Sequence, residues 1–350
     1  MPERRGASRR IVVILGGAVV LSATVLGVKL GLFGARRGGP GALACRVAVD
    51  EKSSLTDLGE ALRNSDPRAL AVLAQRLTPQ PAATPSAVSD REAGEWLATL
   101  AGLRTGYLGF NGPGRALAVT VACRILDRLG VEPAPARWIA VLPPLHDLLE
   151  AAMADSDPGA RVAVLGEVSR LWGWLPGRSL TPAEENTLAD WKDRLYPPLV
   201  RCLGHTDAPT LVAAVACIGA IPLDGAASAA LAYHENEHPA VRRQTLVSFA
   251  RRTTLLTDDM LLKHLHDPDP AVQETANLIL KTRGFTQEQI SLGGLIFSPK
   301  PQQRLSIIPL VKDRDDLDPV VWLLQLSRDP EEMVRLSAIE ALAAHKTPAV

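Results

Sequence analysis

Several features are scarce in this sequence, and each absence narrows what the protein can be. Its cysteines, Cys45, Cys123, Cys202 and Cys217, include no Cys-x-x-Cys pair, so a cysteine-based metal site is not indicated and free thiols are expected. The 38 basic and 38 acidic residues balance, which argues against a polyanion-binding surface that dominates the chain. Aromatic residues make up 4% of a chain that is 47% hydrophobic, which favours helices packed through alanine, leucine and valine.

A spacing of 31 residues organises the C-terminal half of the chain. Four segments at this spacing share positions of proline, apolar residues and arginine: NEHPAVR from 236, DPDPAVQ from 267, SPKPQQR from 298 and DPEEMVR from 329. Apolar residues recur four and eight positions after the sixth residue of each segment, which places them on one face of a helix. A second helical pattern precedes each segment, and the prolines end one helix or begin the next. Each unit is therefore predicted to be a helical hairpin, and such units bury their apolar faces by stacking.

These segments resemble the HEAT family of helical-hairpin repeats, whose motif has Asp-Pro in the turn and Val-Arg at the start of the second helix. The segment from 329 matches in full, whereas the segment from 267 departs at Gln273. The segment from 298 departs at Ser298 and Gln303, and weaker copies begin near Asp66 and Asp157. The resemblance implies an α-solenoid and specifies no chemistry.

The amino-terminal residues predict a membrane anchor. Residues 1–10 carry four arginines, Ile11 to Val28 are 18 residues without a charge, and the apolar run resumes after Lys29. This is about the length that a helix needs to cross a bilayer. The small residues before Cys45 lie too far from the apolar run for a signal-peptidase site, so an uncleaved anchor is expected.

The arginine-rich leading flank favours a cytoplasmic amino terminus and an extracytoplasmic body. The abundance of arginine over lysine suggests a bacterial source. The predicted location is therefore the bacterial inner membrane, with a single pass.

The predicted order of parts is a basic tail over 1–10, a transmembrane anchor over 11–34, a linker over 35–45, a divergent helical region over 46–154 and HEAT-like repeats over 155–350. The predicted fold class is all-α: an α-solenoid of HEAT-like helical hairpins preceded by a single transmembrane helix.

One segment matches a catalytic metal motif. His234-Glu-Asn-Glu-His238 satisfies the pattern His-Glu-x-x-His, in which two histidines on one helix bind zinc and the glutamate polarises a water molecule. Here Pro239 disfavours helical geometry at His238, and the 31-residue register places the segment in a turn. A di-iron hydroxylase on HEAT-like repeats would carry several His-Glu pairs, and this chain has one. His234 and His238 thus remain the metal candidates, while no metal, cofactor or catalytic residue is expected.

Charged residues also recur with the repeat. Arg242, Arg304 and Arg335 occupy equivalent positions, and so do Asp267 and Asp329. The favoured interpretation is that adjacent units pair these charges along the stack. A basic surface for an anionic partner is the alternative.

Two groups of residues are candidates for contact with a partner. Trp172 and Trp174 lie where the repeat spacing is interrupted, and they cannot share a helix face because one residue separates them. The densest basic cluster lacks aromatic residues for stacking on bases and consists of Arg242, Arg243, Arg251 and Arg252.

The predicted function is a non-enzymatic, membrane-tethered scaffold that binds a protein partner through a helical-repeat surface. Two alternatives stay open: a metal-dependent enzyme built on the same solenoid, and nucleic-acid binding through the arginine cluster. The balanced net charge makes nucleic acid the less favoured partner.

Overall fold

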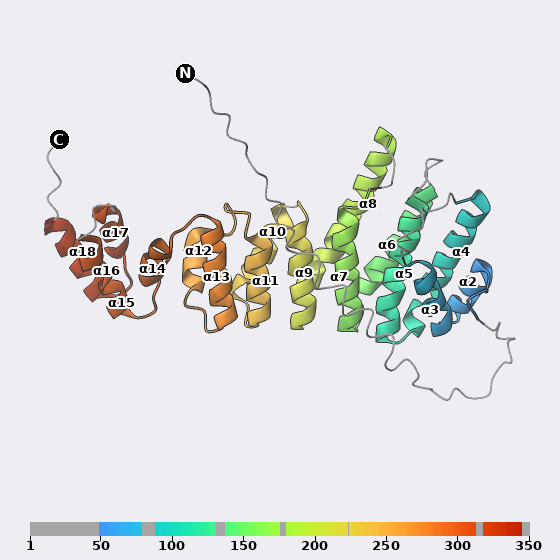
Figure 1. The fold of residues 1–350 in the computed structure, drawn as a ribbon, viewed down its shortest axis with the longest axis horizontal. Coiled ribbons are helices and arrows are strands. Elements are labelled where there is room, and N and C mark those ends of the chain that lie inside the picture. The colour runs from blue at the N-terminus through green and yellow to red at the C-terminus, as the bar shows by residue number, and fades with distance from the viewer. Residues whose placement is uncertain are drawn as a thin grey trace, which may run out of the picture. The chain divides into compact units, whose positions relative to one another are not determined.

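The computed structural model describes residues 49–78, 88–130, 137–175, 180–222, 224–312 and 318–344, and these residues form helices and turns without a strand (Figure 1). The α-helices are α2 (Leu55–Arg63), α3 (Pro67–Arg76), α4 (Asp90–Gly106), α5 (Gly112–Gly130), α6 (Leu142–Met153), α7 (Pro158–Trp172), α8 (Pro182–Arg201), α9 (Ala208–Ala220), α10 (Asp224–Leu231), α11 (Pro239–Phe249), α12 (Asp258–His264), α13 (Pro270–Thr282), α14 (Gln287–Ile296), α15 (Pro301–Leu305), α16 (Ile307–Lys312), α17 (Pro319–Leu326) and α18 (Glu332–Ala344). Short 3₁₀ helices are η2 (Tyr107–Gly109), η3 (Arg137–Val141), η4 (Cys202–Gly204) and η5 (Ala232–Glu235).

Consecutive helices pair into hairpins, and the hairpins stack so that their first helices form one row and their second helices form another. Helices α2 and α3, α4 and α5, α6 and α7, α10 and α11, α12 and α13, and α17 and α18 pack as pairs. Each helix of α3, α5, α7, α9, α11 and α13 also packs on the next of that series, while α2, α4, α6 and α8 form the other row. This arrangement is compatible with a helical-repeat solenoid, and it begins within the region 46–154 that was predicted to be divergent.

Turn residues begin the second helix of most hairpins. Asp66, Asp157, Asp207 and Asp269 each accept a hydrogen bond from a backbone N–H of the first helical turn. A proline follows each of these aspartates in the first turn, where its missing N–H costs no hydrogen bond. These aspartates are therefore helix N-caps, whereas the motif pairs Asp267-Pro268 and Asp329-Pro330 lie in the turns before α13 and α18.

The buried apolar residues form two separate clusters. The larger cluster runs from Leu58 to Ile290, and the smaller runs from Ile307 to Ala341. Helix α14 lies where they divide, because Ile290 belongs to the first cluster and Leu295 packs against the second. The hydrophobic interior is thus interrupted at α14.

The second helix of the hairpin that follows this interruption is broken into α15 and α16. Pro309 has no N–H, and its ring clashes with the carbonyl group four residues earlier, which belongs to Leu305. Helix α15 ends at Leu305, and α16 starts after Ser306. The proline accounts for the position of the break.

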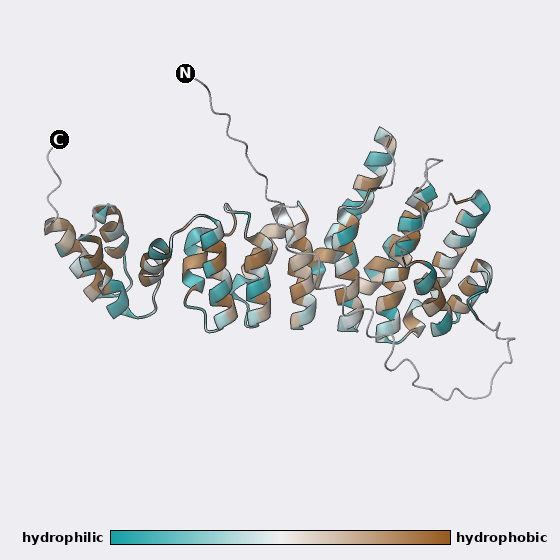
Figure 2. Ribbon diagram, in the orientation of Figure 1, coloured by the Kyte–Doolittle hydropathy of each residue, from teal (hydrophilic) through white to brown (hydrophobic). Residues whose placement is uncertain are grey.

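The predicted solenoid with a transmembrane helix needs correction, and so does the single-pass membrane location. The described residues form an all-α fold in which no helix is both long enough and apolar enough to cross a membrane. Most of these helices carry both hydrophobic and hydrophilic residues (Figure 2), and even the 19-residue α5 contains Arg115, Arg124 and Asp127. The predicted basic tail, anchor and linker, residues 1–10, 11–34 and 35–45, lie outside the described residues.

Candidate functional site

Several hairpin turns are stabilised by the seventh residue of the repeat motif, whose side chain bonds back to the same turn. Motif positions are counted from the first residue of segments such as DPDPAVQ. Arg242 Nη1 donates to the carbonyl oxygen of Asn236, six residues earlier, at 2.9 Å. A turn carbonyl that lacks a helical partner is thereby satisfied. The same bond, over the same six residues, is made by Arg161, Gln273, Arg304 and Arg335.

The arginines also reach the following turn. Arg242 donates from Nη2 to Asp267 Oδ1 at 2.6 Å and from Nε to Asp267 Oδ2 at 2.8 Å. Arg304 and Asp329 form the same two-bonded pair, so the predicted charge pairing between adjacent units is confirmed. We call the series of pairs between successive turns the turn ladder; it consists of Arg115–Asp155, Arg161–Asp207, Arg242–Asp267 and Arg304–Asp329.

The pair of Arg242 and Asp267 is largely withdrawn from solvent. Their side chains are 10% and 4% exposed. Burial alone would raise the pKa of Asp267, but hydrogen bonds from Arg242 and the Asp269 N–H outweigh it and hold the pKa below its usual range. Asp267 is therefore ionised at neutral pH, and the pair joins two turns with full charges.

The turn ladder is interrupted between the turns at 267 and 298, and both partners change together. Gln273 replaces the arginine and Ser298 replaces the aspartate. Gln273 still donates to its own turn carbonyl at 2.6 Å, and Ser298 accepts from the Lys300 N–H. Leu211 and Asn236 depart from the motif as a pair in the same way. Joint replacement leaves no buried charge without its counter-charge.

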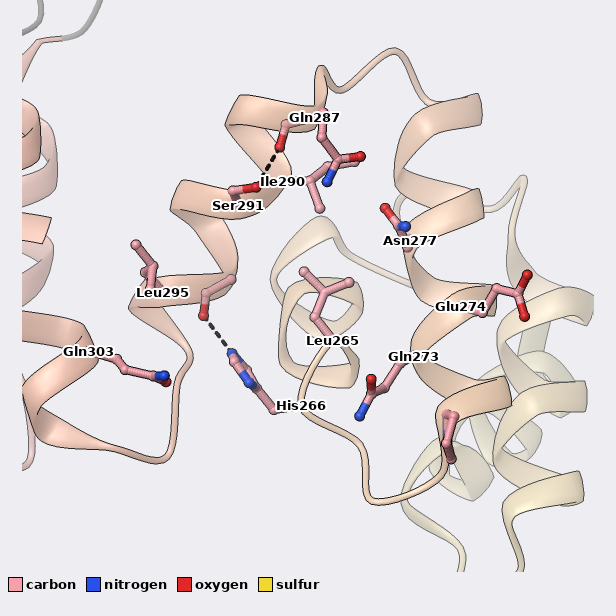
Figure 3. A pocket seen from close by; sticks show the side chains of 12 residues that line it. Leu265, His266, Gln273, Glu274, Asn277, Gln287, Ile290, Ser291, Leu295 and Gln303 are labelled. Atoms are coloured by element: carbon pink, nitrogen blue, oxygen red, sulfur yellow. Dashed lines mark hydrogen bonds between the residues drawn. The ribbon is translucent and has the colours of Figure 1, made fainter. Parts of the chain in front are cut away.

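A groove of about 480 Å³ lies where this pair is missing. Helix α13 forms one side and α14 the other, with the end of the α12 hairpin turn at its base (Figure 3). The residues that line it include Leu265, His266, Asn277, Ile290, Leu295 and Gln303.

The groove exists because one face of α13 is polar where its counterparts are apolar. Asn277 occupies motif position eleven, at which α11 carries Leu246 and α16 carries Ile308. Leu246 and Ile308 are buried. Among the described helices, α11 packs on α13, whereas α13 makes no comparable contact with α15 or α16. The polar face of α13 therefore borders open space.

The groove offers hydrogen-bonding groups above apolar walls. The Asn277 Oδ1 atom is buried and has no hydrogen-bond partner among the described residues. An unsatisfied buried acceptor costs about 1–3 kcal/mol. Asn277 is half-exposed as a residue, so a turn of its amide toward the groove would let a ligand that donates a hydrogen bond recover this energy. Gln273 and Gln303 add amide groups, and Leu265 and Ile290 add apolar surface (Figure 3). The groove can thus hold a ligand that is both polar and apolar.

The histidines of the metal-like motif do not meet each other. His234 lies in η5 and His238 precedes α11, so the motif spans a turn, as predicted from Pro239 and the repeat register. His234 Nδ1 instead lies 3.0 Å from His264 Nε2, and His264 Nδ1 lies 3.3 Å from Asp267 Oδ2. Within the described residues, no group of three or more metal-ligating side chains could hold a metal ion.

We predict that this histidine pair makes stability depend on pH. Burial, the largest effect on both groups, holds the pKa values of His234 and His264 below their ordinary value. In the unfolded chain, histidines have a pKa of about 6.5, so the unfolded chain binds protons more readily than the folded protein. Stability that is present above that pH is therefore lost as the pH falls. Urea denaturation between pH values of about 5 and 8 should show this slope, and it should be shallower in the double variant His234→Gln/His264→Gln. Equal slopes in the two proteins would contradict the prediction.

The two tryptophans predicted to contact a partner pack against the protein itself. Trp172 and Trp174 are both half-buried, and the Trp174 ring lies edge-on to Trp138 with ring centroids 5.8 Å apart. Gly130 leaves room for Trp174, since a Cβ atom at Gly130 would lie 2.4 Å from that ring. Partner contact at these residues stays a prediction.

The four clustered arginines do not form one surface. Arg242 is buried in the turn ladder, while Arg252 is half-buried and donates to the Ile221 carbonyl at 2.6 Å. Arg243 and Arg251 are exposed, but Arg243 lies within α11 and Arg251 lies beyond its end, with seven residues between them. Their role in binding a partner is untested.

Comparisons with known proteins do not assign the chain to a family. No family model matches it, and no curated protein matches it. The crystal structure of an engineered protein from the Northeast Structural Genomics Consortium aligns over 83% of this chain and 72% of its own, with 16% sequence identity and a TM-score of 0.28. Similarity at that level carries no inference about function.

Proposed function

We propose that the chain is a HEAT-like helical-repeat protein that binds an extended segment of a partner protein in the groove beside α13, without catalysing a reaction. The observation that carries the proposal is the buried, unpartnered Asn277 Oδ1 at a position where neighbouring repeats bury an apolar residue. A buried acceptor without a hydrogen bond destabilises the protein, and a bound group that donates to it would remove this penalty and gain affinity.

An extended peptide fits the chemistry of the groove. Its backbone presents N–H donors and C=O acceptors, and amide side chains such as Asn277, Gln273 and Gln303 can bond to both. Its side chains would contact apolar residues such as Leu265 and Ile290. The groove residues do not carry a strong charge of one sign, which favours a peptide over a polyanion.

The test uses a phage-displayed library of random peptides selected on the purified protein. We expect enriched peptides to lose affinity by about tenfold for the variant Asn277→Leu, which corresponds to one hydrogen bond to a buried group. The variant restores the apolar residue of Leu246, so it should keep the fold and its thermal stability. Fluorescence polarisation with the selected peptides would measure the affinities.

The matched control is Asn186→Leu, the same substitution at an exposed position of α8. It should bind the selected peptides as the unchanged protein does. If Asn277→Leu binds them with unchanged affinity, or if no peptide is enriched, the groove is not the binding site.

A further inference from the structure

Three side chains that line the groove beside α13 already use their hydrogen-bond donors within the protein. Gln273 donates from Nε2 to the carbonyl oxygen of its own turn at 2.6 Å, and His266 Nε2 lies 2.6 Å from the Gly294 carbonyl oxygen. Ser291 donates its hydroxyl to a carbonyl group of its own helix at 2.8 Å (Figure 3). A carbonyl oxygen can only accept, so each of these side chains must be the donor.

The atoms that these side chains leave free are acceptors. Gln273 keeps Oε1, Ser291 keeps the lone pairs of Oγ, and the neutral His266 ring with its hydrogen on Nε2 keeps Nδ1. The Asn277 Oδ1 atom adds a further acceptor, since it has no partner among the described residues. The groove thus suits a side chain that carries several N–H donors.

The charges around the groove favour a cation. No lysine or arginine is among the described residues that line it, and Glu274 is their only carboxylate. Figure 3 shows Glu274 on the outer side of α13, where it forms no ion pair with another described residue. The equivalent position of the α11 repeat carries Arg243 instead. A carboxylate at the rim attracts a positively charged group toward the acceptors.

Arginine matches this combination of acceptors and charge. Its guanidinium group has five N–H donors in one plane, whereas the lysine ammonium has three on a single atom. The guanidinium group is also more weakly hydrated, so its withdrawal from water costs less. The methylene groups of an arginine side chain can cover Leu265 and Ile290, two apolar residues of the groove.

We propose that the segment bound in the groove contributes an arginine, whose guanidinium group donates to Gln273 Oε1 and His266 Nδ1. Gln303 accepts from the Ser298 hydroxyl through Oε1, so its amide N–H groups stay available for a carbonyl group of the same segment. This inference rests on the peptide-binding function proposed above, and it names the side chain by which the protein selects its partner.

Peptide pairs that differ in one residue test the arginine. We expect the peptides selected from the phage-displayed library to share an arginine at a fixed position. Citrulline keeps the shape of that side chain but removes its charge and some of its N–H donors. The change to citrulline should lower the affinity by about tenfold or more, because charge-assisted hydrogen bonds are stronger than neutral ones. Fluorescence polarisation with each peptide measures the difference.

The variant Gln273→Arg places a competing positive charge in the groove. It should lower the affinity for the arginine peptide by about tenfold or more and that for the citrulline peptide by less, because like charges repel. Its fold should persist, since Arg335 makes the same turn bond without an ion pair among the described residues. The control Gln325→Arg makes the same change at an exposed position of α17 and should bind both peptides as the unchanged protein does.

The outcomes separate this inference from the proposed function. If the selected peptides lose affinity for Asn277→Leu but share no arginine, or bind equally well with citrulline, the groove binds a peptide and the arginine inference is wrong. An equal effect of Gln273→Arg on both peptides would also overturn it. If no peptide is enriched, or if Asn277→Leu binds with unchanged affinity, the proposed function itself fails and this inference fails with it.

Discussion

Replacing Asp267 by alanine is expected to lower the free energy of unfolding by about 3–5 kcal/mol, because it leaves a buried arginine without its counter-charge. The side chains of Arg242 and Asp267 are 10% and 4% exposed, so water cannot replace the lost partner. Asp267 also accepts from the Asp269 N–H at 2.9 Å, and that bond is lost too. Urea denaturation at neutral pH, followed by circular dichroism, measures the effect.

The chain itself supplies the matched control for this prediction. The double variant Arg242→Gln/Asp267→Ser copies the combination found naturally at Gln273 and Ser298. Its loss in free energy of unfolding should be smaller than the summed losses of the two single variants by about 0.5–3 kcal/mol, because neither partner is left charged without its counter-charge. Strictly additive losses would show that the pair does not act as a unit.

Replacing Gly102 by alanine is expected to cost about 3 kcal/mol, because the added methyl group has no space and meets only backbone. Helices α2 and α4 approach each other so closely that a Cβ atom at Gly102 would lie 2.2 Å from the Gly59 carbonyl oxygen. Backbone cannot rotate away as a side chain can, so the two helices would have to separate. A lowered midpoint of thermal unfolding checks the prediction.

The same helix offers a control of opposite sign. Gly94 has no atom within 4 Å of the place that its Cβ would occupy. Gly94→Ala should therefore stabilise α4 by about 0.5–1 kcal/mol, since alanine favours the helix over glycine. If both variants shift stability in the same direction, close packing at Gly102 is not the cause.

The hairpins could be predicted because their signals are local. The proline turns and the apolar spacing sit within each repeat, and the structure places α13 and α18 where the segments from 267 and 329 require them. The same signals are weak in 46–154, where hairpins form nevertheless. There, close helix contacts such as that between Gly59 and Gly102 hold the helices together, and a turn motif does not reveal them.

The candidate site was less predictable because it depends on contacts between repeats. The local motif pairs His234 with His238, whereas stacking brings His234 against His264, which lies one repeat later. The groove depends on the polar residue Asn277, which lies at motif position eleven. Other repeats carry an apolar residue there, but the seven-residue motif does not include this position, so the motif does not show the difference. The depth of the groove also depends on how α14 sits against α13, which no single segment encodes.

The division of the hydrophobic interior at α14 means that the described repeats need not open all at once. The cluster from Ile307 to Ala341 is small, so its amides should exchange with solvent through sub-global opening at lower free energy than those of the larger cluster. A peptide in the groove would touch Asn277 on one side of the division and Gln303 on the other. Its occupancy would thereby raise the free energy of that opening and couple two regions that otherwise exchange independently.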